Sequence, residues 1–149
     1  MTPRGRRSEC GVKEARARLQ QAVACLRLAG SVAEEPEGGG RLDSARAGTA
    51  VLAAIAASDA ICCALLHQRA RGQDHREAIA LLEIVRWGPG DKDIKTDRAR
   101  RASRALAEAL GIKDQAHYGI EVIGAGQVKR AMRAAQLLVD AAEEVLANP

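Results

Sequence analysis

Apolar residues recur at steps of three and four along most of the chain, which is the spacing that places them on one face of a helix. The first such stripe predicts a helix that stops near Gly30 and consists of Val12, Ala15, Leu19, Ala22, Val23 and Leu26. A second segment, from about Asp43 to Arg69, is apolar on nearly every side. A helix of that kind is buried, so we expect it at the centre of a helical bundle.

Capping signals predict where the next helices begin and end. Asp74 and Glu77 have the spacing of a capping box, which opens a third helix that stops at the Gly-Pro-Gly run over 88–90. The polar segment 91–97 is expected to be a loop, with Asp97 as the N-cap of a fourth helix.

The C-terminal third of the chain continues the helical pattern. Gly111 is expected to kink or end the fourth helix, and residues 112–119 extend it by one or two turns. An extended loop then covers residues 119–126. The last helix is predicted from about Gln127 to Ala147, because its apolar residues again fall on one face.

Composition favours an all-α fold. The chain is 47% hydrophobic, has no Phe and only one Trp and one Tyr, and is rich in Ala. Ala stabilises helices and lets them pack closely, whereas a sheet would contain more β-branched and aromatic residues. With 149 residues the chain has the size of one domain. We therefore predict a disordered basic arm over 1–10 and one antiparallel bundle of four to five helices over 11–149.

Charge and cysteine usage favour a cytoplasmic protein. The net charge of +4 is mildly basic. The four cysteines form no CxxC pair and are interpreted as reduced core residues. Residues 1–10 lack the apolar segment of a signal peptide, and the apolar stretch 51–66 is too short to span a bilayer. Cys63 and His67 are four residues apart, but no further spaced ligands accompany them, so we expect no metal and no cofactor.

Lys113 and His117 are the strongest candidates for chemistry. In a helix they share one face, with Tyr118 beside them. His117 has a side chain that can act as a general base or acid near neutral pH, while Lys113 can offset charge that develops on phosphorus. In the plainer alternative, His117 packs against the bundle and Lys113 is a solvated residue at a helix end.

Two other groups of polar residues accompany this pair. Ser58 and Asp59 lie within the most apolar helix, where an unpaired carboxylate is costly. We expect Asp59 to pair with an Arg or Lys of a neighbouring helix; the alternative is a cleft residue that orients His117 or a ligand. The run RARRASR places three cations on a helix shortly before Lys113, where they either hold RNA phosphates or form a solvated face: Arg100, Arg101 and Arg104.

The chain resembles the HEPN superfamily, especially small stand-alone members of an actinobacterial branch, in the run AAIAASDAICCALLHQRARGQDHREAIALLE and in the later LGIKDQAHYG. The resemblance covers about residues 12–147. It is carried by Ser58-Asp59 in the second helix, the turn over 72–75, the helix opening at 78–82, and Lys113 with Ala116, Tyr118 and Gly119. It implies a helical bundle, frequently a homodimer with a cleft between subunits, and roles in toxin–antitoxin, defence or RNA-processing systems.

Active HEPN members, as the resemblance implies, are metal-independent endoribonucleases with an Arg followed after four to six residues by a His. Here Lys113 stands at the matching position, and three residues separate it from His117. Lys offers a point charge where Arg offers a bidentate fork, so the change is not conservative. Arg69 and His75 have the literal spacing, with five residues between them, but they flank the turn after the second helix, and we interpret that match as chance or helix capping.

Two functions follow as hypotheses. In the first, a HEPN-like module dimerises and binds RNA, a nucleotide or a partner protein such as an antitoxin, without cleaving anything. In the second, the protein is a metal-independent endoribonuclease toxin that uses His117 and Lys113, with Tyr118 positioning the substrate. The Lys in place of Arg favours the first hypothesis.

Overall fold

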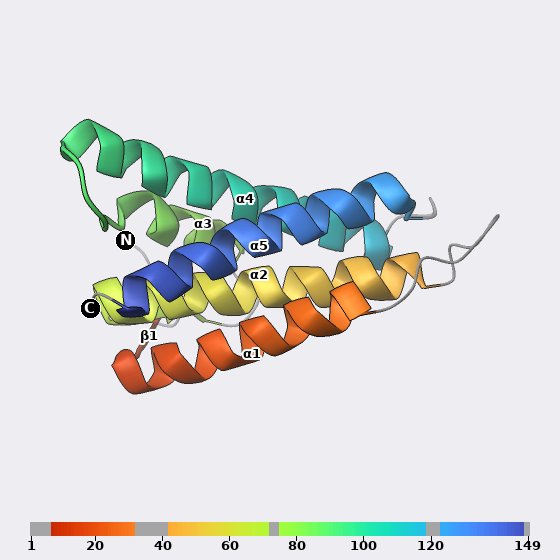
Figure 1. Cartoon of the computed structure of the whole chain (residues 1–149), viewed down its shortest axis with the longest axis horizontal. Helices are drawn as coiled ribbons and strands as arrows, with labels where there is room; N and C mark the ends of the chain where they lie inside the picture. Colours follow the sequence, from red (N-terminus) through yellow and green to blue (C-terminus); the bar gives the residue numbers. More distant parts are fainter. Residues whose placement is uncertain (1–6, 32–41, 72–74, 119–122, 148–149) are drawn as a thin grey trace.

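The computed structural model describes residues 7–31, 42–71, 75–118 and 123–147, with the side chains of 116–118 excepted. This part is mostly helical and confirms the predicted helical bundle (Figure 1). Its elements, in chain order, are β1 (Arg7–Glu9), α1 (Val12–Ser31), α2 (Asp43–Leu66), β2 (Gln68–Ala70), α3 (His75–Ile84), α4 (Lys92–Tyr118) and α5 (Ala125–Ala147).

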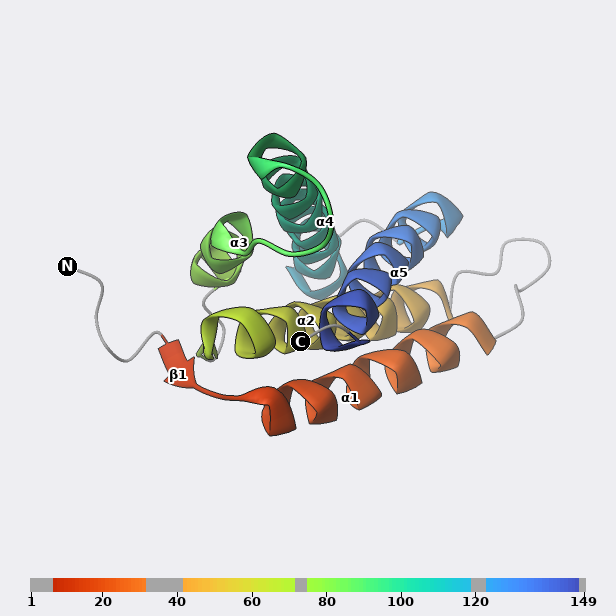
Figure 2. The same ribbon diagram turned by 60° about the vertical axis from the view of Figure 1, so that its left-hand side comes forward.

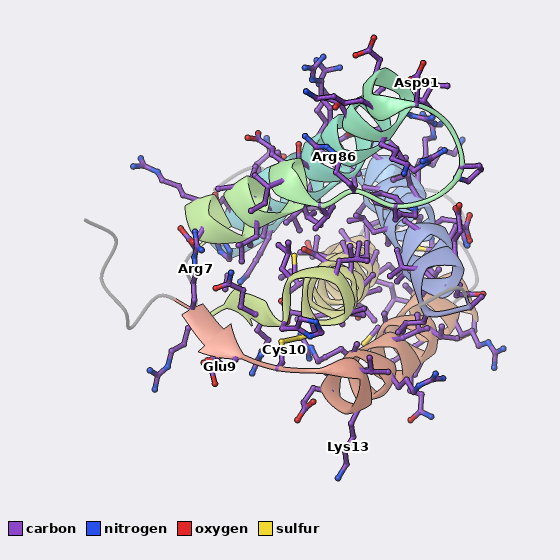
Figure 3. The ribbon with its side chains drawn as sticks, turned by 90° about the vertical axis from the view of Figure 1, so that its left-hand side faces the viewer. Arg7, Glu9, Cys10, Lys13, Arg86 and Asp91 are labelled. Atoms are coloured by element: carbon purple, nitrogen blue, oxygen red, sulfur yellow. A yellow bond between two sulfur atoms is a disulfide. The ribbon has the colours of Figure 1, made fainter. Side chains whose placement is uncertain are left out.

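Helix α2 is the centre of the bundle, as its sequence predicted. It packs against α1 and α5 most extensively and against α4 and α3 on its remaining sides, and Figure 3 shows it end-on among them. Most of its residues from Ala47 to Cys63 are buried, and many are Ala, which allows neighbouring helices to approach closely. The helix is long and apolar enough to cross a membrane, but 67% of its most apolar window is buried inside the bundle, as in the core helix of a soluble protein.

Helix α4 begins six residues earlier than the sequence predicted. The segment 92–97, expected to be a loop, is helical. Its cap is Asp91 rather than Asp97, since the Asp91 Oδ1 atom accepts a hydrogen bond from the Ile94 amide at 3.0 Å. The helix then continues through Gly111 as far as Tyr118. The proposed capping residue of α3, Asp74, lies outside the described residues.

Helix α2 ends at Leu66, before the predicted Arg69. His67 adopts a left-handed backbone conformation, with φ of 58°, and turns the chain out of the helix. The next three residues form β2, which pairs antiparallel with β1. The prediction of a disordered arm is therefore wrong for residues 7–10, whereas residues 1–6 lie outside the described part (Figure 2).

A disulfide fixes this N-terminal segment to the central helix. Cys10, directly after β1, is bonded to Cys63 near the end of α2, with 5.1 Å between their Cα atoms and a sequence separation of 53. Figure 3 shows the bond running from Cys10 toward α2. The expectation of four reduced cysteines is thus wrong for this pair, while Cys25 and Cys62 are free.

Removing the disulfide should lower the stability of the fold. We expect Cys10→Ser to reduce the free energy of unfolding by roughly 2 to 4 kcal/mol, because the cross-link restricts the unfolded chain over a long loop. Urea unfolding followed by circular dichroism measures this change. Cys25→Ser, at a free half-buried cysteine, is the control and should stay within about 1 kcal/mol of the native protein. Equal stability of Cys10→Ser and the native protein would contradict the prediction.

Candidate functional site

A cavity of about 270 Å³ on one side of α2 is lined by two of the charged candidate residues, Asp59 and Lys113, and by further cations. Five elements contribute to its wall. The polar and titratable residues that line it are Arg18 from α1, Ser58 and Asp59 from α2, Arg69 from β2, His75 from α3 and Lys113 from α4. The apolar part of its lining includes Leu52, Ile55, Leu106 and Leu110. We refer to it below as the α2 pocket.

Asp59 is the organising residue of the α2 pocket. Its side chain is only 10% exposed, and the Oδ2 atom accepts hydrogen bonds from Arg18 Nε at 3.1 Å and Nη2 at 2.7 Å. Arg69 Nη1 approaches the same oxygen at 3.5 Å. The expected pairing of Asp59 with a cation of a neighbouring helix is therefore confirmed, with Arg18 as the main partner.

Burial and ion pairing shift the pKa of Asp59 in opposite directions. Removal from water raises the pKa of the Asp59 carboxyl above its usual value, and this effect exceeds the lowering by the Arg18 and Arg69 guanidinium groups. Ser58, beside it, is buried and faces Cys62. Burial raises the pKa of the Cys62 thiol to about 12, so that cysteine is unreactive at neutral pH.

The pocket carries a net positive charge. Three permanent cations, Arg18, Arg69 and Lys113, face one carboxylate, and the imidazole of His75 adds a titratable group. The side chain of Arg69 is 41% exposed and has only a long contact to Asp59, so most of its guanidinium remains accessible from the pocket. Such an arrangement can bind an anion with several acceptor oxygens, because Arg and Lys both donate charge-assisted hydrogen bonds.

The structure places the side chain of only one member of the predicted pair, Lys113, and gives the backbone position of the other, His117. Lys113 lines the α2 pocket, and α4 continues beyond it, so the backbone positions of Lys113 and His117 are one helical turn apart. The side chains of His117 and Tyr118 lie outside the described residues. Their expected roles stay predictions.

The arginine cluster of α4 does not join the α2 pocket. Arg100, Arg101 and Arg104 are all exposed. Arg104 precedes the pocket residue Leu106 by two positions and therefore lies on the opposite side of the helix. Arg101 instead lines a second cavity beside Trp87 and α5. An RNA held by these arginines would follow a different face from the one that contains Lys113.

Sequence reasoning missed three pocket residues, Arg18, Arg69 and His75. Arg18 was passed over although it lies three residues after Ala15 and four before Ala22, inside the apolar stripe of α1, where a cation signals a buried partner. His75 was set aside together with Arg69 as a chance match, yet both residues line the same cavity. Cys63 is committed to the disulfide, and the described residues contain no group of three or more His, Cys, Asp or Glu arranged to hold a metal.

No protein-family model matches the chain, and a comparison with curated proteins finds no significant match. The resemblance to the HEPN superfamily therefore stays a prediction that rests on the residues given above.

The raised pKa of Asp59 predicts an unusual pH dependence. Between the usual carboxyl pKa of 3.8 and the raised value, the folded state binds more protons than the unfolded state, so the free energy of unfolding falls as pH rises through that window. We expect the stability of the native protein relative to Asp59→Asn to decrease over the same range. Urea unfolding at several pH values measures this difference. A stability difference that grows with pH would show that the arginine pairs outweigh the burial cost.

Proposed function

We propose that the protein is a HEPN-like helical module that binds the phosphate group of a nucleotide or of RNA in the α2 pocket without cleaving it. The observation that carries the proposal is the convergence of Arg18, Arg69 and Lys113, from three separate elements, on one small cavity. Phosphate is the common biological anion with enough acceptor oxygens to engage several cations at once.

The form of the cavity supports a small phosphate-bearing group as its occupant. A volume of about 270 Å³ is at the lower end of ligand sites and admits a phosphate with part of a sugar. Leu52, Ile55 and Leu110 provide apolar surface beside the cations. Apolar walls reduce the local dielectric constant, which strengthens the contact between a phosphate and the fixed positive charges.

The positions of the proton-transfer groups favour binding over catalysis. Two arginines pair with the Oδ2 atom of Asp59, so this carboxylate already serves as their anchor. Among the described pocket residues, His75 is then the one imidazole available for general acid–base work. Cleavage of RNA needs both deprotonation of the attacking hydroxyl and protonation of the leaving oxygen, and a single group performs both poorly.

A second candidate function, a metal-independent endoribonuclease, is favoured by one observation: His75 lies in the same cavity as Arg69 and Lys113. In that reaction the imidazole takes the proton of a ribose 2′-hydroxyl, the hydroxyl oxygen attacks phosphorus to form a 2′,3′-cyclic phosphate, and the 5′-oxygen of the next nucleotide leaves with the proton that the imidazolium returns. The cations would stabilise the charge that builds on the phosphoryl oxygens. The endoribonuclease hypothesis with His117 as the base, as predicted from the sequence, also remains a proposal.

We also propose that the protein forms a homodimer in the cytoplasm and serves in a toxin–antitoxin, defence or stress system, alone or with a partner protein. Leu52 is 53% exposed at the rim of the α2 pocket, and apolar residues at such positions are commonly covered in oligomers. Light scattering at micromolar concentration tests the dimer, and a monomer mass would exclude it.

Binding of pyrophosphate tests the proposed function. Calorimetry should detect binding at low salt that weakens as ionic strength rises. Arg69→Ala and Lys113→Ala should each weaken it about tenfold, the loss of roughly one charge-assisted contact. Arg133→Ala is the matched control, because Arg133 is exposed on α5 and does not line the pocket, and its affinity should stay within about twofold. Equal binding by Arg69→Ala, Lys113→Ala and the native protein would place the anion elsewhere.

Incubation with total RNA in EDTA separates binding from cleavage. We expect intact RNA with the native protein, because His75 is the one imidazole among the described residues of the pocket. Metal-independent cleavage that disappears in His75→Ala would establish the second candidate at the α2 pocket. Cleavage that persists in His75→Ala but disappears in His117→Ala would place the reaction at the end of α4.

A further inference from the structure

We propose that the Cys10–Cys63 disulfide is a reducible site at which a dithiol reductant attacks Cys10 and thereby loosens the α2 pocket. The proposal rests on the proposed phosphate-binding function for its effect on binding, while its chemical and structural parts are independent of that function. Two observations support it. Cys10 and Cys63 differ in exposure, and the N-terminal segment contacts β2 and α3, which line the α2 pocket.

The two cysteines differ in accessibility. Cys63 is fully buried, in a small apolar cluster with Ala15 and Leu146. Cys10 is half-buried and lines an open hollow on the surface together with Glu9, Gly11, Glu14, Leu66, His67 and Gln68. Because Cys10 lines this hollow and Cys63 is buried, the proposed point of attack for a thiolate from solution is Cys10, with Cys63 as the leaving sulfur.

The exchange balances in two steps. A thiolate of the dithiol attacks Cys10 Sγ, a mixed disulfide forms, and the Cys63 sulfur leaves and takes up a proton. The second thiolate of the reductant then attacks its own sulfur in the mixed disulfide, and Cys10 leaves as a thiol. The reductant loses two electrons and two protons and becomes a cyclic disulfide, while Cys10 and Cys63 gain them.

The reductant must supply the second thiol itself. Cys62, next to Cys63, is 2% exposed and is held as a neutral thiol by burial, so it does not take over the exchange. Cys25 lies on α1, two helical turns and more from Cys10 along the chain. A monothiol consequently stops at the mixed disulfide with Cys10 unless it is present in large excess.

The bond anchors a segment that holds two walls of the pocket. We call residues 7–10, which comprise β1 and Cys10, the strap. Ser8 of the strap pairs with Arg69 of β2, so the strap fixes the backbone that carries this pocket cation. Arg7 forms an ion pair with Glu77 on α3, the helix that carries His75, and Figure 3 shows Arg7 extending from β1 in that direction.

The strap depends on the disulfide because the sheet is too small to persist by itself. Each strand has three residues, and an isolated two-stranded ladder of that size is at most marginally stable in water. Besides this ladder and the Arg7–Glu77 ion pair, the Cys10 amide donates a hydrogen bond to the carbonyl of His67, which directly follows α2, at 3.1 Å. Once the bond is reduced, the strap separates more readily and Arg69 loses its fixed position.

The rim of the hollow restricts which reductant reacts. Glu9 and Glu14 place two carboxylates beside Cys10, and hydrogen bonds to backbone amides lower the pKa of Glu14 and keep it charged. Negative charge at the point of attack repels anionic thiolates. We therefore expect cysteamine, whose ammonium group offsets the thiolate charge, to form the mixed disulfide several-fold faster than glutathione at low salt.

The experiment compares air-oxidised protein with protein reduced by dithiothreitol. Alkylation and mass spectrometry should show two more modified cysteines after reduction, at Cys10 and Cys63. Hydrogen exchange at the amides of 68–70 should accelerate at least about tenfold, whereas the amides of α2 from Val51 to Ile61 should stay protected. Pyrophosphate affinity should fall about tenfold, as in Arg69→Ala, and should recover on reoxidation.

Two variants control the experiment. The double variant Cys10→Ser with Cys63→Ser should have the hydrogen exchange and the pyrophosphate affinity of the reduced protein, and dithiothreitol should not change them. Cys25→Ser should respond to dithiothreitol like the native chain. Circular dichroism establishes that each remains helical. Unchanged exchange at 68–70 on reduction, or free thiols at Cys10 and Cys63 in the air-oxidised protein, would overturn the proposal. Faster exchange with no pyrophosphate binding in either state would support the reducible strap and reject the proposed function.

Discussion

A carboxylate in the middle of the central helix constrains the rest of the structure. Asp59 lies where α2 is enclosed by its neighbours, and a charge at that depth is tolerated only with partners. Arg18 reaches it from α1 and Arg69 from β2, so one oxygen atom determines how two separate elements meet the central helix. Replacing the carboxylate with an apolar residue would leave these arginines without a common anchor.

The same requirement creates the candidate site. The two arginines that pair with Asp59 reach it from α1 and β2, and Lys113 adds a third cation to the lining of the same cavity. Apolar side chains of α2 and α4 complete this lining. The ion pairs of Asp59 and the proposed phosphate site therefore share the same residues, and the strap that holds Arg69 contributes to both.

The sequence predicted the helices well because each depends on a local pattern. The stripe of α1, the all-round apolar character of α2 and the need of Asp59 for a cationic partner follow from spacing and burial alone, whereas the identity of that partner, Arg18, does not. The strap does not, because three residues carry no periodicity and their strand exists only through β2 and the disulfide. Four cysteines allow several pairings, and nothing in their spacing selects Cys10 with Cys63. Asp91 and Asp97 are equally good caps by residue type, and the structure uses Asp91.

The disulfide bears on where the protein resides and on the proposed control of the α2 pocket. The cytoplasmic prediction relied partly on reduced cysteines, and disulfides persist mainly in oxidising surroundings. A bond whose half-buried cysteine lines a surface hollow is instead suited to the reversible exchange proposed above. Since Arg69 links the strap to Asp59 and to the proposed phosphate, loss of the bond would weaken an ion pair and the proposed ligand contact together. In this proposal the redox state of Cys10 is coupled to the α2 pocket through Arg69 in β2 and through the Arg7–Glu77 contact with α3.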